Sequence, residues 1–75
     1  MNKSRLFDLS LYDYQMICKA ASEYRQLMNT QILTKGEFVQ CIFSDYLYDA
    51  DLTIDEFSNY ALGLTIQKGA ADVLD

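Results

Sequence analysis

Leu33-Thr34-Lys35-Gly36-Glu37-Phe38 is the middle copy of a pattern that occurs three times in the chain and sets the expected fold. The pattern is leucine, a hydroxyl residue, two variable residues, an acid and an aromatic residue. The other copies are Leu9-Ser10-Leu11-Tyr12-Asp13-Tyr14 and Leu52-Thr53-Ile54-Asp55-Glu56-Phe57. The hydroxyl and the acid fit a helix capping box, and the flanking leucine and aromatic fit a hydrophobic staple. Three copies therefore predict three helix starts, and their unequal spacing argues against a solenoid.

The expected fold is an all-α three-helix bundle, with helices over about residues 11–28, 35–47 and 54–67. The middle helix is expected to be central, because its apolar residues cover nearly its whole circumference. These residues are Phe38, Val39, Cys41, Ile42, Phe43, Tyr46 and Leu47. The chain is predicted to be one helical domain over residues 1–75. Residues 70–75 are expected to form a short C-terminal tail, either disordered or one extra turn.

Composition excludes several classes of protein. The chain has 75 residues, of which 51% are hydrophobic, and a formal net charge of −5. This apolar fraction is too high for a disordered acidic tail, and the length allows one domain. No run of about 18 apolar residues is present, so no membrane span is predicted. The N-terminal basic residues are not followed by an apolar stretch, which predicts no secretory signal and a cytoplasmic location.

The residue types needed for most metal and catalytic sites are scarce. Histidine is absent, and Cys18 and Cys41 are too few for a zinc site. Both are interpreted as buried thiols, although a disulfide in an oxidising compartment stays open. Asp49, Asp51, Thr53 and Asp55 alternate as in a calcium loop, but the glycine and glutamate of an EF-hand are missing. We expect no cofactor, no metal and no enzymatic activity.

The charge distribution points to a protein partner. Residues 1–35 carry a net charge of +2 and residues 36–75 a net charge of −7, which disfavours direct nucleic-acid binding. Acidic and tyrosine-rich surfaces suit basic partners. The expected partner-binding residues are Tyr46, Tyr48, Asp49, Asp51 and Asp55, together with Met16 and Leu27 from the surplus apolar surface.

The leading hypothesis is a small protein-binding regulator that acts stoichiometrically on a larger, basic, nucleic-acid-binding protein. Antirepressors, inhibitors and antitoxins act in this way. One alternative is a dimeric helix-turn-helix-like DNA-binding regulator built from the predicted helices over 35–47 and 54–67. Another is a homo-oligomeric structural module. Formation of a homodimer stays open, and it would favour the two alternatives over a foreign partner.

Overall fold

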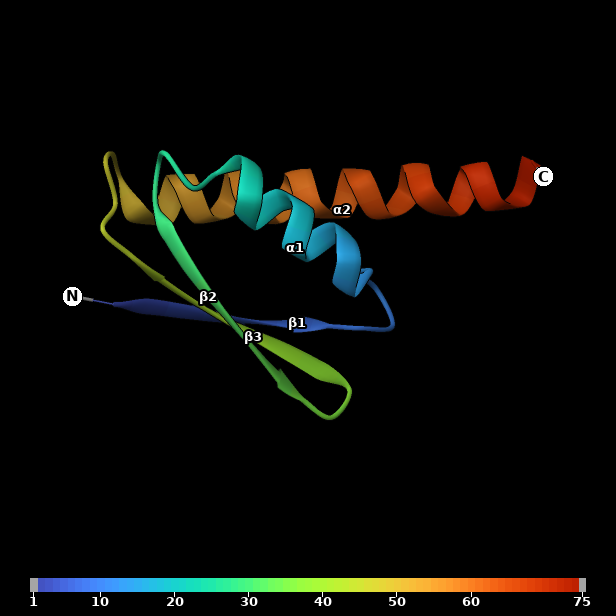
Figure 1. Cartoon of the computed structure of the whole chain (residues 1–75), viewed down its shortest axis with the longest axis horizontal. Helices are drawn as coiled ribbons and strands as arrows, with labels where there is room; N and C mark the ends of the chain where they lie inside the picture. Colours follow the sequence, from blue (N-terminus) through green and yellow to red (C-terminus); the bar gives the residue numbers. More distant parts are fainter. Residues whose placement is uncertain (1, 75) are drawn as a thin grey trace.

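In the computed structural model, the backbone is described for residues 2–74 and the side chains for residues 2–70. The chain forms a three-stranded antiparallel sheet and two helices, with β3 in the middle of the order β1-β3-β2. Both helices lie on the same side of the sheet (Figure 1). The fold is therefore α+β. In chain order the elements are β1 (Lys3–Asp8), α1 (Tyr14–Glu23), β2 (Asn29–Lys35), β3 (Phe38–Ser44) and α2 (Ala50–Leu74).

The three-helix bundle was a wrong prediction, and the main error lies at residues 35–47. Val39, Cys41 and Phe43 are fully buried against the helices, while the intervening residues point to the other face of the sheet. β3 pairs with a strand on each side, and apolar side chains occur on both of its faces. A strand of this kind is hard to distinguish by periodicity from a helix that is apolar all round.

The middle capping pattern is a hairpin turn. Gly36 and Glu37 connect β2 to β3 between the paired residues Lys35 and Phe38. Gly36 has a φ of 63°, a left-handed conformation that glycine adopts without the steric penalty of a Cβ atom. Glycine in the first position of a two-residue loop is typical of a tight β-hairpin. The residues interpreted as a helix start therefore reverse the chain between two strands.

The first predicted helix, over residues 11–28, is much shorter in the structure. α1 begins at Tyr14, and its N-cap is Asp13, whose Oδ1 accepts a hydrogen bond from the backbone N–H of Met16 at 3.2 Å. The helix ends at Glu23, and the chain then turns into β2. Ser10, the expected cap, lies in the preceding turn instead.

The last helix is longer than expected. α2 begins at Ala50 and continues through Leu74, so the predicted tail is helical up to that residue; Asp75 lies outside the described residues. Thr53, the expected cap, lies inside the helix. At about 1.5 Å per residue α2 spans about 37 Å. Its C-terminal part extends past the rest of the molecule (Figure 1). With this helix end included, the longest dimension of the structure is 43 Å.

These changes remove the helix-turn-helix architecture, because β3 stands where its first helix was expected. The side chains between the sheet and the helices form one core cluster centred on Phe57. Its ring lies 5.3 Å from that of Phe43, 5.7 Å from that of Tyr24 and 6.0 Å from that of Phe7, all three edge-on. Such edge-to-face pairs add to the stabilisation that area burial supplies.

Candidate functional site

The candidate site is the stretch that leaves the sheet and starts α2, residues 45–56, which we call the acidic segment. Its first residue, Asp45, has a φ of 54°, a conformation that aspartate tolerates better than most residues. Asp49 then starts the helix. Its Oδ1 accepts the backbone N–H of Leu52 at 2.9 Å, and its carbonyl oxygen accepts the hydroxyl of Thr53 at 2.8 Å. The segment is thus held in a defined conformation at the N-terminal end of α2.

Two of the acids are paired within the molecule. Lys3 Nζ lies 2.7 Å from Asp51 Oδ1, and the hydrogen bond and charge of Asp51 raise the pKa of Lys3. Arg5 donates to Asp55 Oδ1 at 2.9 Å and to the hydroxyl of Ser58 at 2.9 Å. These contacts join β1 to α2. Asp51 and Asp55 therefore have an internal structural role, although their side chains stay largely exposed.

The other acids of the segment are not neutralised in this way. Among the described residues, Asp45, Asp49 and Glu56 have no lysine or arginine nitrogen within ion-pair distance. All three are exposed. At these three positions the negative charge predicted for this part of the chain is therefore solvent-exposed.

Large apolar side chains are exposed beside these acids. Leu47, Tyr48 and Leu52 have exposed fractions of 62%, 69% and 60%. The backbone N–H of Leu47 donates to the carbonyl of Leu27 at 2.9 Å, which ties the segment to the connection after α1. Exposed apolar side chains among charged ones are typical of protein-binding surfaces. Leu47 and Leu52 were missing from the predicted site, because helix periodicity assigned Leu47 to a buried face and Leu52 to a staple.

The remaining predicted site residues lie in different surroundings. Tyr46 packs against the core, and its hydroxyl donates to the carbonyl of Phe43 at 2.7 Å. Leu27 is half-buried next to the acidic segment, through the backbone contact with Leu47. Met16 is half-buried in the first turn of α1. That turn lies against the distal part of α2, about 15–20 Å along the helix from the acidic segment.

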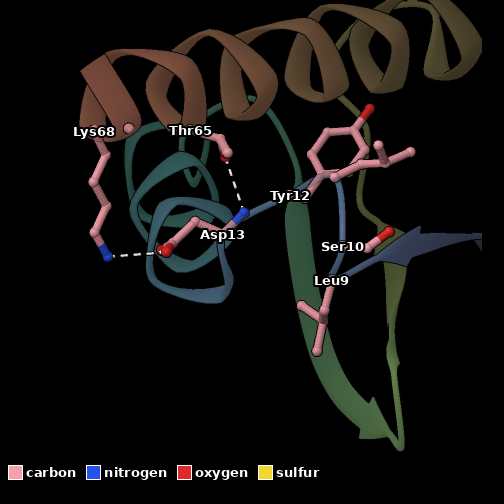
Figure 2. Close-up of a pocket in the computed structure, with 8 residues that line it drawn as sticks. Leu9, Ser10, Tyr12, Asp13, Thr65 and Lys68 are labelled. Atoms are coloured by element: carbon pink, nitrogen blue, oxygen red, sulfur yellow. Dashed lines mark hydrogen bonds and ion pairs between the residues drawn. The ribbon is translucent and has the colours of Figure 1, made fainter. Parts of the chain in front are cut away.

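A hollow of about 310 Å³ lies where the β1–α1 connection meets the distal part of α2 (Figure 2). Lys68 Nζ lies 2.9 Å from Asp13 Oδ2 and also donates to Gln15 at 3.2 Å. The hydrogen bond from Lys68 lowers the pKa of Asp13. The backbone N–H of Asp13 donates to the hydroxyl of Thr65 at 3.0 Å. These polar groups form hydrogen bonds and an ion pair with one another. The arrangement therefore indicates a structural contact between the start of α1 and the distal part of α2, and not a ligand site.

A second hollow, of about 460 Å³, lies on the hairpin side of the same connection and is lined by Asp8, Leu9, Ser10, Gly36 and Glu37. Its two acids have no neighbouring histidine, cysteine or lysine in the lining that could act with them as an acid–base or nucleophilic pair. Within residues 2–70, whose side chains the structure describes, no three metal-binding side chains come together. Neither helix has a described stretch that is long and apolar enough to cross a bilayer.

No family model, curated protein or solved structure matches this chain.

Proposed function

We propose that the protein is a stoichiometric protein-binding regulator that docks a larger, basic, nucleic-acid-binding protein on its acidic segment. The observation that carries the proposal is the combination of three exposed apolar side chains with acids that have no internal cation. Leu47, Tyr48 and Leu52 supply the apolar contact. Asp45 and Glu56 supply the charge that attracts a basic surface and fixes its orientation.

The positions of the basic side chains favour this proposal over direct DNA binding. Lys3, Arg5 and Lys68, half of the six lysines and arginines, are paired with carboxylates. A duplex-binding surface needs clustered cations that contact phosphates. We place the activity in the cytoplasm, where thiols such as those of Cys18 and Cys41 stay reduced.

The test is site-specific photo-crosslinking from Tyr48, with Ile66 as the matched control. Both side chains are similarly exposed, at 69% and 63%, but Ile66 lies well outside the acidic segment on α2. A photoreactive phenylalanine analogue at each position is irradiated in extracts of the source cells, and the crosslinked protein is identified by mass spectrometry. We expect a basic nucleic-acid-binding protein to be captured from position 48, and its yield to fall as salt is raised.

Two further variants test whether the crosslinking yield depends on the negative charge of the acidic segment. Glu56→Gln removes a negative charge from the acidic segment, and Glu37→Gln removes one from the hairpin at the other end of β3. The Glu56 change should lower the crosslinking yield, and the Glu37 change should leave it unaltered. Equal capture from positions 48 and 66, or capture only of neutral or acidic proteins, would contradict the proposal.

A further inference from the structure

No described residue buries the face of the sheet that points away from the helices. Residues on a strand alternate between two faces, and Val39, Cys41 and Phe43 point toward the helices. Their neighbours on β3 and the residues paired with them therefore lie on the opposite face, which we call the open sheet face. It consists of Ser4, Leu6, Asp8, Asn29, Gln31, Leu33, Lys35, Phe38, Gln40, Ile42 and Ser44.

This face differs from the rest of the surface in composition. It carries four large apolar side chains, and none of its residues is buried. Leu6 and Phe38 are 59% and 41% exposed. Its only charged residues are Asp8 and Lys35, one of each sign, so the face is neutral in a chain of net charge −5. A neutral apolar face can approach a second copy without the repulsion that two acidic surfaces would cause.

We infer that two copies of the chain associate through their open sheet faces, with a two-fold axis parallel to β3. The basis is the register of the sheet. A rotation about such an axis places β1 of one copy over β2 of the other, and β3 over β3. Leu6 and Leu33 are both in register with Gln40, so Leu6 faces Leu33 of the second copy. Isologous packing of this kind needs a surface that is complementary to itself.

Each set of residues in register across the three strands forms a row, and the other rows of the open sheet face match in the same way. Ile42 and Phe38 meet their own counterparts along the axis, and the two Gln40 amides can donate to and accept from each other. Ser4 and Gln31 are both in register with Ile42, so polar residues face polar residues there. No row of the face places an apolar residue of β1 opposite a charged residue of β2.

The two charges provide the sharpest match. Asp8 and Lys35 are both in register with Phe38, so the rotation brings Asp8 over Lys35 of the second copy, twice per dimer. The backbone N–H of Ser10 donates to Asp8 at 2.9 Å and lowers the pKa of Asp8, which keeps this carboxylate charged. Packed sheets rotate by about 30°, which displaces Asp8 by about 4 Å from Lys35 of the second copy, within the reach of a lysine side chain.

The size of the face sets the strength of the association. Three strands about 4.8 Å apart and about 20 Å long give a footprint of about 300 Å². Stable dimers bury about 800 Å² per partner, so this dimer is weak. We therefore expect it to form only at high protein concentration.

The test is sedimentation equilibrium over a wide concentration series, from roughly 1 to 500 µM, because an interface this small predicts a weak dimer. The average mass should rise from 8.6 kDa toward twice that value. Asp8→Lys and Lys35→Glu each place like charges opposite each other and should weaken the dimer at least about tenfold. The double variant restores opposite charges and should dimerise within about threefold of the original chain. Inside one copy the two positions are separated by two strand spacings, about 10 Å, so the exchange acts mainly between copies.

Thermal unfolding checks that each variant is folded before its mass is interpreted. A monomer at every concentration overturns the inference, because the open sheet face then does not bind a second copy. A dimer that is equally strong in both single variants also overturns it, and indicates pairing through the edge strands β1 or β2. Failure of the double variant to recover contradicts the two-fold axis parallel to β3. None of these results depends on whether the acidic segment binds a basic protein.

Discussion

Asp13 joins the two helices, and its removal should destabilise the protein through two separable contacts. Its Oδ1 caps α1 by accepting the Met16 N–H, and its Oδ2 pairs with Lys68 of α2. Loss of an aspartate N-cap costs about 1 kcal/mol. The ion pair adds about 0.5 kcal/mol, a value reduced by solvent screening because the two side chains are 30% and 37% exposed.

Asp13→Ala loses both contacts and should lower the free energy of unfolding by about 1.5 kcal/mol. Asp13→Asn keeps a capping oxygen but loses the charge, so it should lower the free energy of unfolding by only about 0.5 kcal/mol. Lys68→Met should have a similar effect. The Asp13→Asn and Lys68→Met double variant should be no less stable than either single variant, because both changes remove the same interaction.

The assay is urea unfolding followed by circular dichroism at 222 nm, with the midpoint compared at constant slope. The pH dependence gives a second readout. Lys68 lowers the pKa of Asp13 below its ordinary value of 3.8, so this stabilisation is present above that value. It is lost as the pH falls through the lowered pKa, and Asp13→Asn should lack this loss. If Asp13→Asn destabilises as much as Asp13→Ala, or the double variant shows additive losses, the two-contact explanation is wrong.

Three further predictions concern the core. Among residues 2–70, no group forms a hydrogen bond with the buried hydroxyl of Thr30, so Thr30→Val should raise the free energy of unfolding by about 1 kcal/mol. A loss of stability in urea unfolding would show that the hydroxyl has a partner. Phe57→Leu should lower the free energy of unfolding by about 2 kcal/mol, because the side chain loses edge-to-face contacts with three rings. An unchanged urea midpoint would show that this aromatic cluster does not stabilise the core. Burial raises the pKa of Cys41 to about 12. A thiol reagent at pH 8 should therefore label the less buried Cys18 first, and Cys41 only on unfolding. If mass spectrometry finds Cys41 labelled in the folded protein, the burial of Cys41 is contradicted.

The sequence pattern indicated the two helical segments that exist, but it wrongly assigned a helix to residues 35–47, because it could not separate a cap from a turn. The predicted helix over 54–67 lies inside α2, since Phe57 and Ala61 follow helix periodicity and face the core. A hydroxyl residue followed by an acid three residues later also occurs where Gly36 turns a hairpin. Glycine at that position was the available signal, because it favours a left-handed turn and weakens a helix.

Because β3 lies in the middle of the sheet, its sequence lacks the regular alternation that usually identifies a strand. A half-buried strand shows polar and apolar residues in alternation, but Phe38 and Ile42 place apolar side chains on the open sheet face as well. The pattern then resembles an apolar helix, and only tertiary pairing decides between the two. The β-branched and aromatic residues of this stretch favoured a strand.

For the candidate site, the acidic and tyrosine-rich character of the segment could be deduced from composition. The internal pairing of Asp51 and Asp55 could not, because Lys3 and Arg5 are about 50 residues away in the chain. Exposure of Leu52 likewise depends on which face of α2 packs against the sheet. Tertiary contacts of this kind are not encoded in local spacing.

The most direct test of the proposed docking surface is the affinity of the crosslinked partner for four variants, measured by isothermal titration calorimetry. Tyr48→Ala and Glu56→Gln alter the acidic segment, while Ile66→Ala and Glu37→Gln are the matched controls. We predict that Tyr48→Ala weakens binding about tenfold, or about 1.4 kcal/mol, and that Glu56→Gln weakens it about threefold. Both controls should stay within about twofold of the original affinity. Equal losses in the controls, or full affinity of Tyr48→Ala, would show that the partner docks elsewhere.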